Sequence, residues 1–143
     1  MKHVCKPSLQ KESMKETQMD NNNLRKYLKA KIEKTTGWTA SFTEAVAVSL
    51  IPYITFEIAE LASDDDGKHI MELTVDAWGK HTPRDVITVI DALDEAFKKH
   101  KELTDDFMIQ IFLGSIRQFV EDEDKTIKRL QRKYDLIVYE RGA

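Results

Sequence analysis

The fold of this chain is decided by residues 53–78, which read YITFEIAELASDDDGKHIMELTVDAW. Apolar and polar residues alternate on both sides of a central run of Asp and Gly, and this alternation is the period of a half-buried strand. Asp and Gly tolerate the left-handed backbone of tight loops, so residues 63–67 are predicted to form a turn. The stretch therefore predicts an antiparallel hairpin with strands at residues 53–61 and 70–78.

Two helices are predicted on either side of this hairpin. Upstream, apolar residues recur at helical spacing over residues 23–35, where Asn23 caps the first turn and Gly37 supplies a stop. Downstream, Thr82 is the expected cap of a helix with Pro83 at its first position. The apolar stripe expected to cover the sheet consists of Val86, Val89, Ile90, Leu93 and Phe97. The side chains expected to face water are Asp91, Asp94, Glu95, Lys98 and Lys99.

The remaining segments predict an edge strand and a second hairpin. Residues 38–51 are interpreted as an edge strand plus a loop. Residues 108–120 predict a strand in which Gly114 marks a bulge or a close backbone approach. A charged turn at 121–124 then leads into a closing strand around 130–138. The expected fold class is α+β, with a mainly antiparallel sheet of four to five strands packed with two helices in the order α-β-β-β-α-β-β.

Length and composition favour one domain. The chain has 143 residues, and its 22 basic and 25 acidic residues give a net charge of -3, which provides no global attraction to nucleic acid or to anionic lipid. Residues 1–20 are polar and are expected to be a disordered leader, or an upstream extension of a shorter chain that starts at Met19. Residues 21–143 are expected to form a single α+β domain. The sequence shows no membrane-spanning run and no signal peptide, so we expect a cytoplasmic protein.

The motifs of common enzymes are missing from the sequence. We find no nucleophile elbow, no phosphate loop and no dinucleotide fingerprint, and the five glycines are scattered along the chain. No two of the four histidines have the spacing of helical metal ligands, and residues 64–67 lack the ligand spacing of a calcium loop. The single cysteine, Cys5, cannot form an internal disulfide. The sequence therefore predicts no catalytic residue, no metal site and no cofactor.

Charge is concentrated in two acidic turns and one basic strand. The acidic turns contain Asp64, Asp65, Asp66, Glu121, Asp122, Glu123 and Asp124. The basic strand contains Lys125, Lys128, Arg129, Arg132 and Lys133. We interpret this strand as facing solvent or a neighbouring subunit. The alternative is contact with nucleic acid phosphates, but no aromatic residues interleave with these bases and the adjoining acids would repel a phosphate backbone.

Three segments together carry a resemblance. They are IPYITF at 51–56, LTVDAW at 73–78 ahead of a helix that starts with proline, and DLIVYE at 135–140. In their order and spacing, over roughly residues 20–141, they resemble the tail-completion family of long-tailed bacteriophages, which comprises tail terminator and head-to-tail joining proteins. The shared motifs are structural, so no catalytic residue is carried over.

The resemblance implies a virion structural protein. It would form a hexameric ring that caps the tail tube, ends its polymerisation and joins it to the head connector, without a cofactor. Its expected partners are copies of itself, the tail tube protein and the connector, with DNA passing through the lumen without specific binding. Its expected location is the head-proximal end of the virion tail, after assembly in the bacterial host cytoplasm.

The resemblance gives the charged segments two alternative roles. The acidic turns would line the lumen and repel DNA over about 8 to 10 Å, or they would dock onto a neighbouring ring. The basic strand would then pair with acids of an adjacent subunit. Apolar residues on the second faces of the strands, such as Ile70, Trp78, Ile137 and Tyr139, would meet neighbours or else pack under the first helix.

Another function class competes with this interpretation. A cytosolic binding module, such as a toxin immunity or inhibitor protein, would be a monomer or dimer whose charge lies on one side. A nucleic acid binder that uses the basic strand is a third class, and its affinity would fall steeply with salt. An enzyme is the least expected class, because no nucleophile, base and oxyanion donor can be assembled from these residues.

Overall fold

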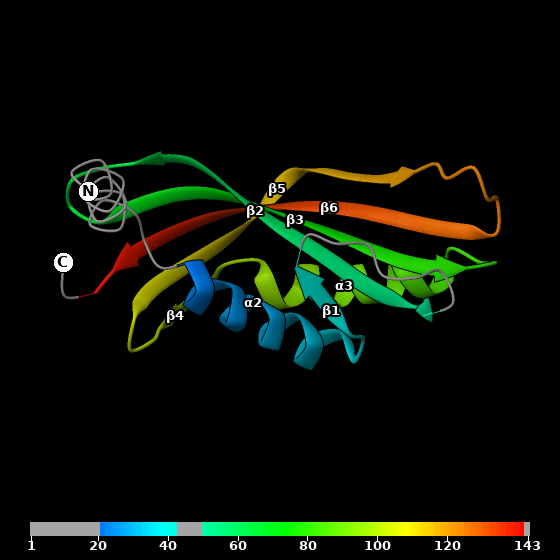
Figure 1. Cartoon of the computed structure of the whole chain (residues 1–143), viewed down its shortest axis with the longest axis horizontal. Coiled ribbons are helices and arrows are strands. Elements are labelled where there is room, and N and C mark those ends of the chain that lie inside the picture. Colours follow the sequence, from blue (N-terminus) through cyan, green and yellow to red (C-terminus); the bar gives the residue numbers. More distant parts are fainter. Residues whose placement is uncertain (1–20, 43–49, 142–143) are drawn as a thin grey trace, which may run out of the picture.

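The computed structural model describes residues 21–42 and 50–141, which form one sheet and two helices (Figure 1). The predicted α+β class is confirmed. The predicted leader at 1–20 and the predicted loop at 43–49 lie outside the described residues. The elements in chain order are α2 (Asn21–Thr36), β1 (Ala40–Phe42), β2 (Tyr53–Ser63), β3 (Lys68–Lys80), α3 (Arg84–Phe97), β4 (His100–Leu103), β5 (Phe107–Val120) and β6 (Ile127–Glu140).

The sheet has six strands in the order β1-β2-β3-β6-β5-β4. β1 runs parallel to β2, and every other neighbouring pair is antiparallel. The expectation of a mainly antiparallel sheet of four to five strands was therefore wrong in the number of strands, and the sheet is mixed because β1 pairs in parallel. β1 has three residues and β4 has four, and segments this short do not display a period that sequence inspection can detect.

Both predicted hairpins are confirmed, and their turns lie at opposite ends of the sheet. β3 pairs with β6 from Lys68 opposite Tyr139 to Lys80 opposite Ile127. The β2–β3 turn adjoins the first of these pairs, and the β5–β6 turn adjoins the last. Because a strand rises about 3.3 Å per residue, the two turns are separated by roughly 40 Å along β3.

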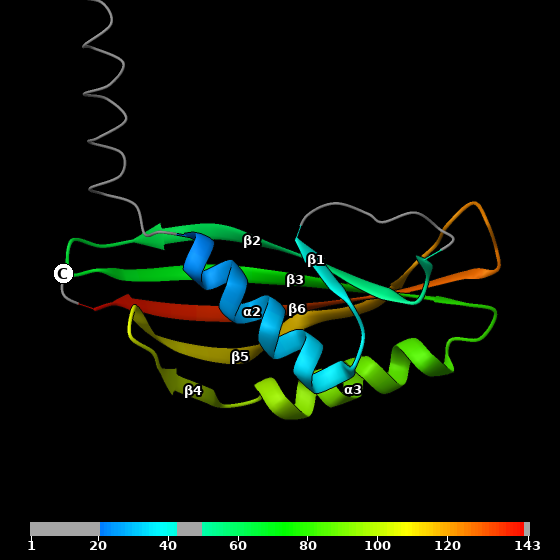
Figure 2. The ribbon, with the colours of Figure 1, turned by 60° about the horizontal axis from the view of Figure 1, so that its bottom comes forward.

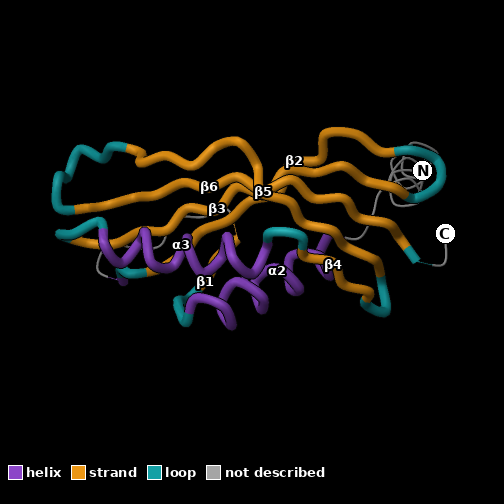
Figure 3. The backbone as a smooth tube through the Cα atoms, turned by 180° about the vertical axis from the view of Figure 1, so that it is seen from behind, coloured by secondary structure: helices purple, strands orange, loops and turns teal. Residues whose placement is uncertain are grey.

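Both helices pack on the same face of the sheet (Figure 3). This face carries the alternating apolar residues of the strands, such as Leu73 of β3 and Leu136 of β6, which are fully buried against the helices. We call this face the inner face. The opposite, outer face carries Ile70, Trp78, Ile137 and Tyr139, because side chains alternate along a strand. These residues therefore do not pack under the first helix, which was one of the two sequence-based alternatives.

The second helix begins one residue later than the sequence predicts. Pro83 rather than Thr82 occupies the N-cap position of α3, and it makes no side-chain cap hydrogen bond. The Thr82 hydroxyl still accepts the backbone N–H of Arg84 at 3.2 Å, so it satisfies one free donor of the first turn. Neither described helix is long and apolar enough to span a bilayer.

The predicted bulge at Gly114 is confirmed. The register of β5 against β6 shifts between Leu113 and Arg117. A Cβ atom at Gly114 would lie 2.4 Å from the backbone oxygen of Lys133, so only glycine allows the two backbones to approach this closely.

Candidate functional site

The β2–β3 turn is built by one of its own aspartates. The Asp64 carboxylate accepts the backbone N–H of Asp66 at 2.9 Å and that of Lys68 at 3.1 Å. Gly67 has a φ of 84°, which is the left-handed conformation that the sequence predicted for this turn. Its carbonyl also accepts the N–H of Glu140, which ties the turn to the end of β6. Asp64 thus holds the turn, and the carboxylates of Asp65 and Asp66 are exposed.

The β5–β6 turn is built in the same way. Asp122 accepts the N–H of Asp124, and Asp124 in turn accepts both the N–H and the hydroxyl of Thr126 at 2.9 and 2.7 Å. The hydroxyl hydrogen bond is the main cause of a lowered pKa for Asp124, and the backbone hydrogen bond adds to it. Glu121 and Glu123 of this turn are exposed.

The two acidic turns do not meet in one chain, because they lie at opposite ends of β3. Each end of the sheet in one subunit therefore bears one acidic turn. The sequence left open which turn would line a lumen and which would dock. In the structure, the β2–β3 turn lies beside the end of β6, whereas the β5–β6 turn lies beside Pro83 at the start of α3.

The five residues of the basic strand do not form one basic surface. Arg132 points to the inner face and is buried, where its Nε donates to Asp94 at 2.9 Å. Arg129 and Lys133 belong to the outer face and pair with Asp76 at 3.0 Å and Glu72 at 3.4 Å. The prediction of a subunit-facing basic strand is therefore wrong for Arg132, because alternation along β6 sends its side chain into the core. Lys125 and Lys128 remain on the surface near the turn.

A polar cluster that the sequence did not predict is centred on Asp94 of α3. Its carboxylate accepts hydrogen bonds from Arg132, from the Tyr134 hydroxyl at 2.8 Å and from Arg117 at 2.7 Å. Arg117 also donates to Asp91 at 2.7 Å. Burial and the Asp94 carboxylate raise the pKa of Tyr134, so its hydroxyl remains a donor. The prediction that Asp94 faces water was wrong, because three donors from β5 and β6 surround it.

Sequence signals for this cluster were present in β6. Arg132 occupies an apolar position in the alternation of Leu130, Tyr134 and Leu136. A buried guanidinium requires a carboxylate partner, so this break in the pattern indicates an acidic residue on the covering helix. Arg132 also donates to the carbonyls of Gly114 and Ile116, and it thereby fills the gap that the β5 bulge leaves.

His69 joins the ends of three strands on the inner face. Its Nδ1 lies 2.8 Å from Oε2 of Glu60 on β2, and its Nε2 lies 3.2 Å from Oε2 of Glu140 on β6 without hydrogen-bond alignment. Burial lowers the pKa of His69, but the two carboxylates outweigh burial, so the net shift is upward. Protonated His69 is thus stabilised between two acids.

A second histidine lies between α2 and β4. The Tyr27 hydroxyl is 2.7 Å from Nε2 of His100 and donates to Glu102, which also accepts from Lys31 at 3.3 Å. Burial raises the pKa of Tyr27 and the Glu102 carboxylate adds to this, whereas burial and Lys31 lower the pKa of His100. A neutral imidazole and a protonated phenol make this cluster an anchor for α2 on β4.

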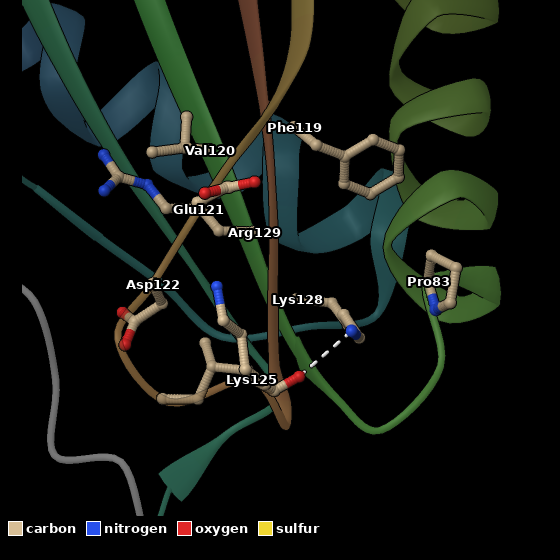
Figure 4. Close-up of a pocket in the computed structure, with 9 residues that line it drawn as sticks. Pro83, Phe119, Val120, Glu121, Asp122, Lys125, Lys128 and Arg129 are labelled. Carbon is tan, nitrogen blue, oxygen red and sulfur yellow. Dashed lines mark hydrogen bonds between the residues drawn. The ribbon is translucent and has the colours of Figure 1, made fainter.

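A pocket of about 310 Å³ opens beside the β5–β6 turn (Figure 4). The Phe119 ring and Pro83 form an apolar wall next to α3. Lys128 reaches past the strand and donates from Nζ to the carbonyl of Lys125 at 3.0 Å, while Glu121 contributes a carboxylate. Charges of both signs line the pocket, with Glu121 and Asp122 beside Lys125, Lys128 and Arg129.

The outer face of the sheet is uncovered at the end that bears the β2–β3 turn. Register places Ile70 beside Ile137, and Tyr139 beside Met108, which in turn pairs with Leu103 on β4. Leu103 is 64% exposed. This patch lies on the face opposite both helices, and no described element covers it.

No protein-family model matches the sequence, and no curated protein matches it either. Within the described ranges, no three His, Cys, Asp or Glu side chains are arranged to hold a metal ion. The uncovered face and the two acidic turns are surface features of the described residues.

Proposed function

We propose that the chain is a tail terminator, a virion protein that forms a ring on the end of a bacteriophage tail tube. The observation that carries the proposal is the sheet with both helices on one face and an apolar patch on the other. A contiguous apolar surface of this kind marks a protein interaction site, because exposed apolar area is costly in water. The patch therefore favours a subunit of an assembly.

The order of elements supports the same proposal. The chain runs from helix α2 to the strand that opens with Pro52 and Tyr53, then through a strand that ends in Asp76-Ala77-Trp78, and then into the helix after Pro83. Two long final strands follow. This is the element order implied by the resemblance to tail-completion proteins, with the short strands β1 and β4 added at the sheet edges.

In the proposed ring, six copies surround a lumen. One side of the ring binds the tail tube protein and stops further addition, and the other side binds the head connector. DNA passes through without specific binding, because carboxylates that face a lumen repel it over about 8 to 10 Å. The chain would act at the head-proximal end of the tail after assembly in the host cytoplasm, and it needs no cofactor for this role.

The charge distribution favours a ring subunit over a toxin inhibitor. An inhibitor that uses an acidic surface concentrates its carboxylates on one side of the molecule. Here the two acidic turns are roughly 40 Å apart along β3, given about 3.3 Å per residue. A subunit of a ring that has a neighbour on either side can contact a different neighbour with each turn.

Growth of tail tubes tests the proposal. Tail tube protein from the same phage is polymerised with and without this chain, and tube lengths and ends are measured by negative-stain electron microscopy. We expect caps on the tube ends and shorter tubes as the chain is added. Bare ends and unchanged lengths at saturating concentration would refute the terminator function.

A further inference from the structure

The outer sides of β2 and β5 are each paired over only part of the strand: β1 pairs with three of the eleven residues of β2, and β4 with four of the fourteen residues of β5 (Figure 2). β1 pairs with β2 at Ile54–Phe56, and on the side of β2 away from β3 no strand of the described part of the chain lies beside residues 57–63. At the other edge, β4 pairs with β5 at residues 108–111, and on the side of β5 away from β6 no described strand lies beside residues 112–120. We call these two segments the open half of β2 and the open half of β5.

The open half of β5 is apolar and unprotected. It carries four of the eight exposed large hydrophobic side chains, which are Phe112, Leu113, Ile116 and Phe119. Soluble proteins usually guard a sheet edge with charges, a proline or a very short strand. The single charge in this segment, Arg117, is already paired with Asp91 and Asp94. Such an edge is a template for another strand.

We propose that the open half of β5 pairs with the open half of β2 of a second copy of this chain. The pairing is antiparallel, with residues 114–120 beside residues 63–57 of the neighbour. This ladder uses all seven residues of the open half of β2 and the last seven of the nine in the open half of β5, and the covered parts of the two strands lie at opposite ends of the sheet. β4 of one copy and β1 of the next therefore lie beyond the two ends of the new ladder and do not obstruct it.

In this register, inner-face side chains of β5 lie beside inner-face side chains of the neighbour's β2. Arg117 and Phe119 belong to the inner face of β5, and Ile58 and Glu60 belong to the inner face of β2. The pairing sets Phe119 against Ile58, which is an apolar cross-strand pair. It also places Arg117 level with Glu60, in addition to the contacts that Arg117 makes with Asp91 and Asp94 and that Glu60 makes with His69. Cross-strand pairs of apolar residues and of opposite charges both stabilise a sheet.

Charge complementarity selects this partner over the isologous alternative at β2. Two β2 edges facing each other would bring Glu57 and Glu60 of both copies together, which is unfavourable. In the proposed register, the acidic turn of the neighbour reaches the start of β4. The exposed Lys98 and Lys99 lie there. Because His100 pairs with Ile111, these two lysines adjoin the first residues of the open half of β5. The Asp65 and Asp66 carboxylates then meet lysines.

The pairing closes into a ring. It joins two different edges, so it is heterologous and repeats from copy to copy. Gln118 is level with Thr55 of its own β2 but pairs with Ala59 of the neighbour, a stagger of about four residues or 13 Å. Across four strand spacings of about 4.8 Å, this stagger tilts the strands by about 35°, which lies within the range of closed barrels.

This inference rests on the proposed function as a ring subunit, and disulfide trapping tests it separately. In a Cys5→Ser background, one chain carries Gln118→Cys and another carries Ala59→Cys, both at exposed positions on the outer face. Cross-strand neighbours have Cα atoms 4.5 to 5.5 Å apart, which suits a disulfide. The matched control replaces Gln118→Cys with Lys101→Cys, which is exposed on β4 and far from residue 59 in this register.

The expected result is a covalent dimer in the mixture, in several-fold excess over either variant alone and over the control mixture. A chain that carries both cysteines should give a ladder of covalent multimers. A dimer from Gln118→Cys alone would mean that two β5 edges pair, which would overturn the proposal. Absence of any cross-link at high concentration, with native circular dichroism, would overturn it as well.

A charge placed on the open edge provides an independent readout. Ile116→Lys should reduce the mass of the assembly in light scattering, because lysine on an edge blocks strand addition. Leu50→Lys is the matched control, since Leu50 is also exposed but lies outside the outer-face patch and outside both open edges. Equal masses for Ile116→Lys and wild type would contradict the edge pairing. Cross-links without tube capping would refute only the terminator function, and capping without cross-links would refute only the pairing.

Discussion

At the scale of single residues, Asp94 makes the clearest contribution to the fold. It accepts hydrogen bonds from Arg132, Tyr134 and Arg117, and its side chain is 18% exposed. Arg132 is buried, so without Asp94 its charge has no carboxylate partner at hydrogen-bond distance. The cluster therefore ties α3 to β5 and β6 through one carboxylate.

Asp94→Ala should lower the free energy of unfolding by about 3 to 5 kcal/mol, because it leaves a buried charge uncompensated. Asp91→Ala is the matched control, since Asp91 is 60% exposed and pairs only with the partly exposed Arg117. The control should cost less than about 1 kcal/mol. Urea unfolding followed by circular dichroism measures both, and equal losses for the two variants would contradict the role given to Asp94.

His69 makes stability depend on pH. Its pKa is raised in the folded chain, because the two carboxylates outweigh burial. The folded state therefore binds the proton more tightly, and the stabilisation is fully present below the unfolded pKa of about 6.5. It is lost as pH rises from there through the folded pKa. His100 has a lowered pKa and titrates below this window.

The wild-type free energy of unfolding should thus fall as pH is raised above about 6.5 through the folded pKa of His69. His69→Gln should flatten this part of the profile, whereas His100→Gln should leave it in place. Unfolding by urea at a series of pH values provides the measurement. The interpretation fails if His69→Gln retains the wild-type slope above pH 6.5.

At the scale of elements, Gly114 determines how β5 bends along β6. The glycine carbonyl accepts from Arg132, and its Cα approaches the Lys133 backbone. Gly114→Ala should cost about 1 to 3 kcal/mol, because the added methyl meets backbone atoms that cannot move aside. Ser115→Ala, at the exposed next residue, should stay within about 0.5 kcal/mol. Thermal unfolding that shows equal shifts would contradict the close approach.

Element prediction from sequence succeeded where a pattern was long enough. β3 alternates over thirteen residues and α3 carries a complete apolar stripe, so both were predicted with nearly correct bounds. β4 has four residues next to a run of lysines and was missed. The parallel pairing of β1 depends on contacts with Ile54 and Phe56 far along the chain, and no local period reports it.

The polar sites were harder to predict than the elements. Asp94 was assigned to water because it borders the charged side of α3, and only Arg132, from the apolar face of β6, reverses that assignment. The acidic turns were predicted as turns, and the structure adds that Asp64 and Asp124 hold them. Their separation along β3 follows from the register, which sequence patterns do not give.

At the scale of the whole molecule, charge reversal tests how copies meet. Lys98→Glu with Lys99→Glu should weaken self-association, because the neighbour's Asp65 and Asp66 would then face like charges. Asp65→Lys with Asp66→Lys in the same chain should restore it by reversing both partners. Sedimentation at several salt concentrations measures the association. The docking role of this turn would be excluded if Lys98→Glu with Lys99→Glu left the association unchanged, or if the added Asp65→Lys and Asp66→Lys failed to restore it.

The central claim is that copies of this chain join edge to edge into a closed ring, and mass in solution tests it most directly. Light scattering over a range of concentrations, followed by negative-stain imaging, should show one closed species of six copies, each of 16.6 kDa. The ring should keep that mass when the concentration is raised further. A 16.6 kDa monomer at every concentration, or a fibre that lengthens without limit, would contradict the account.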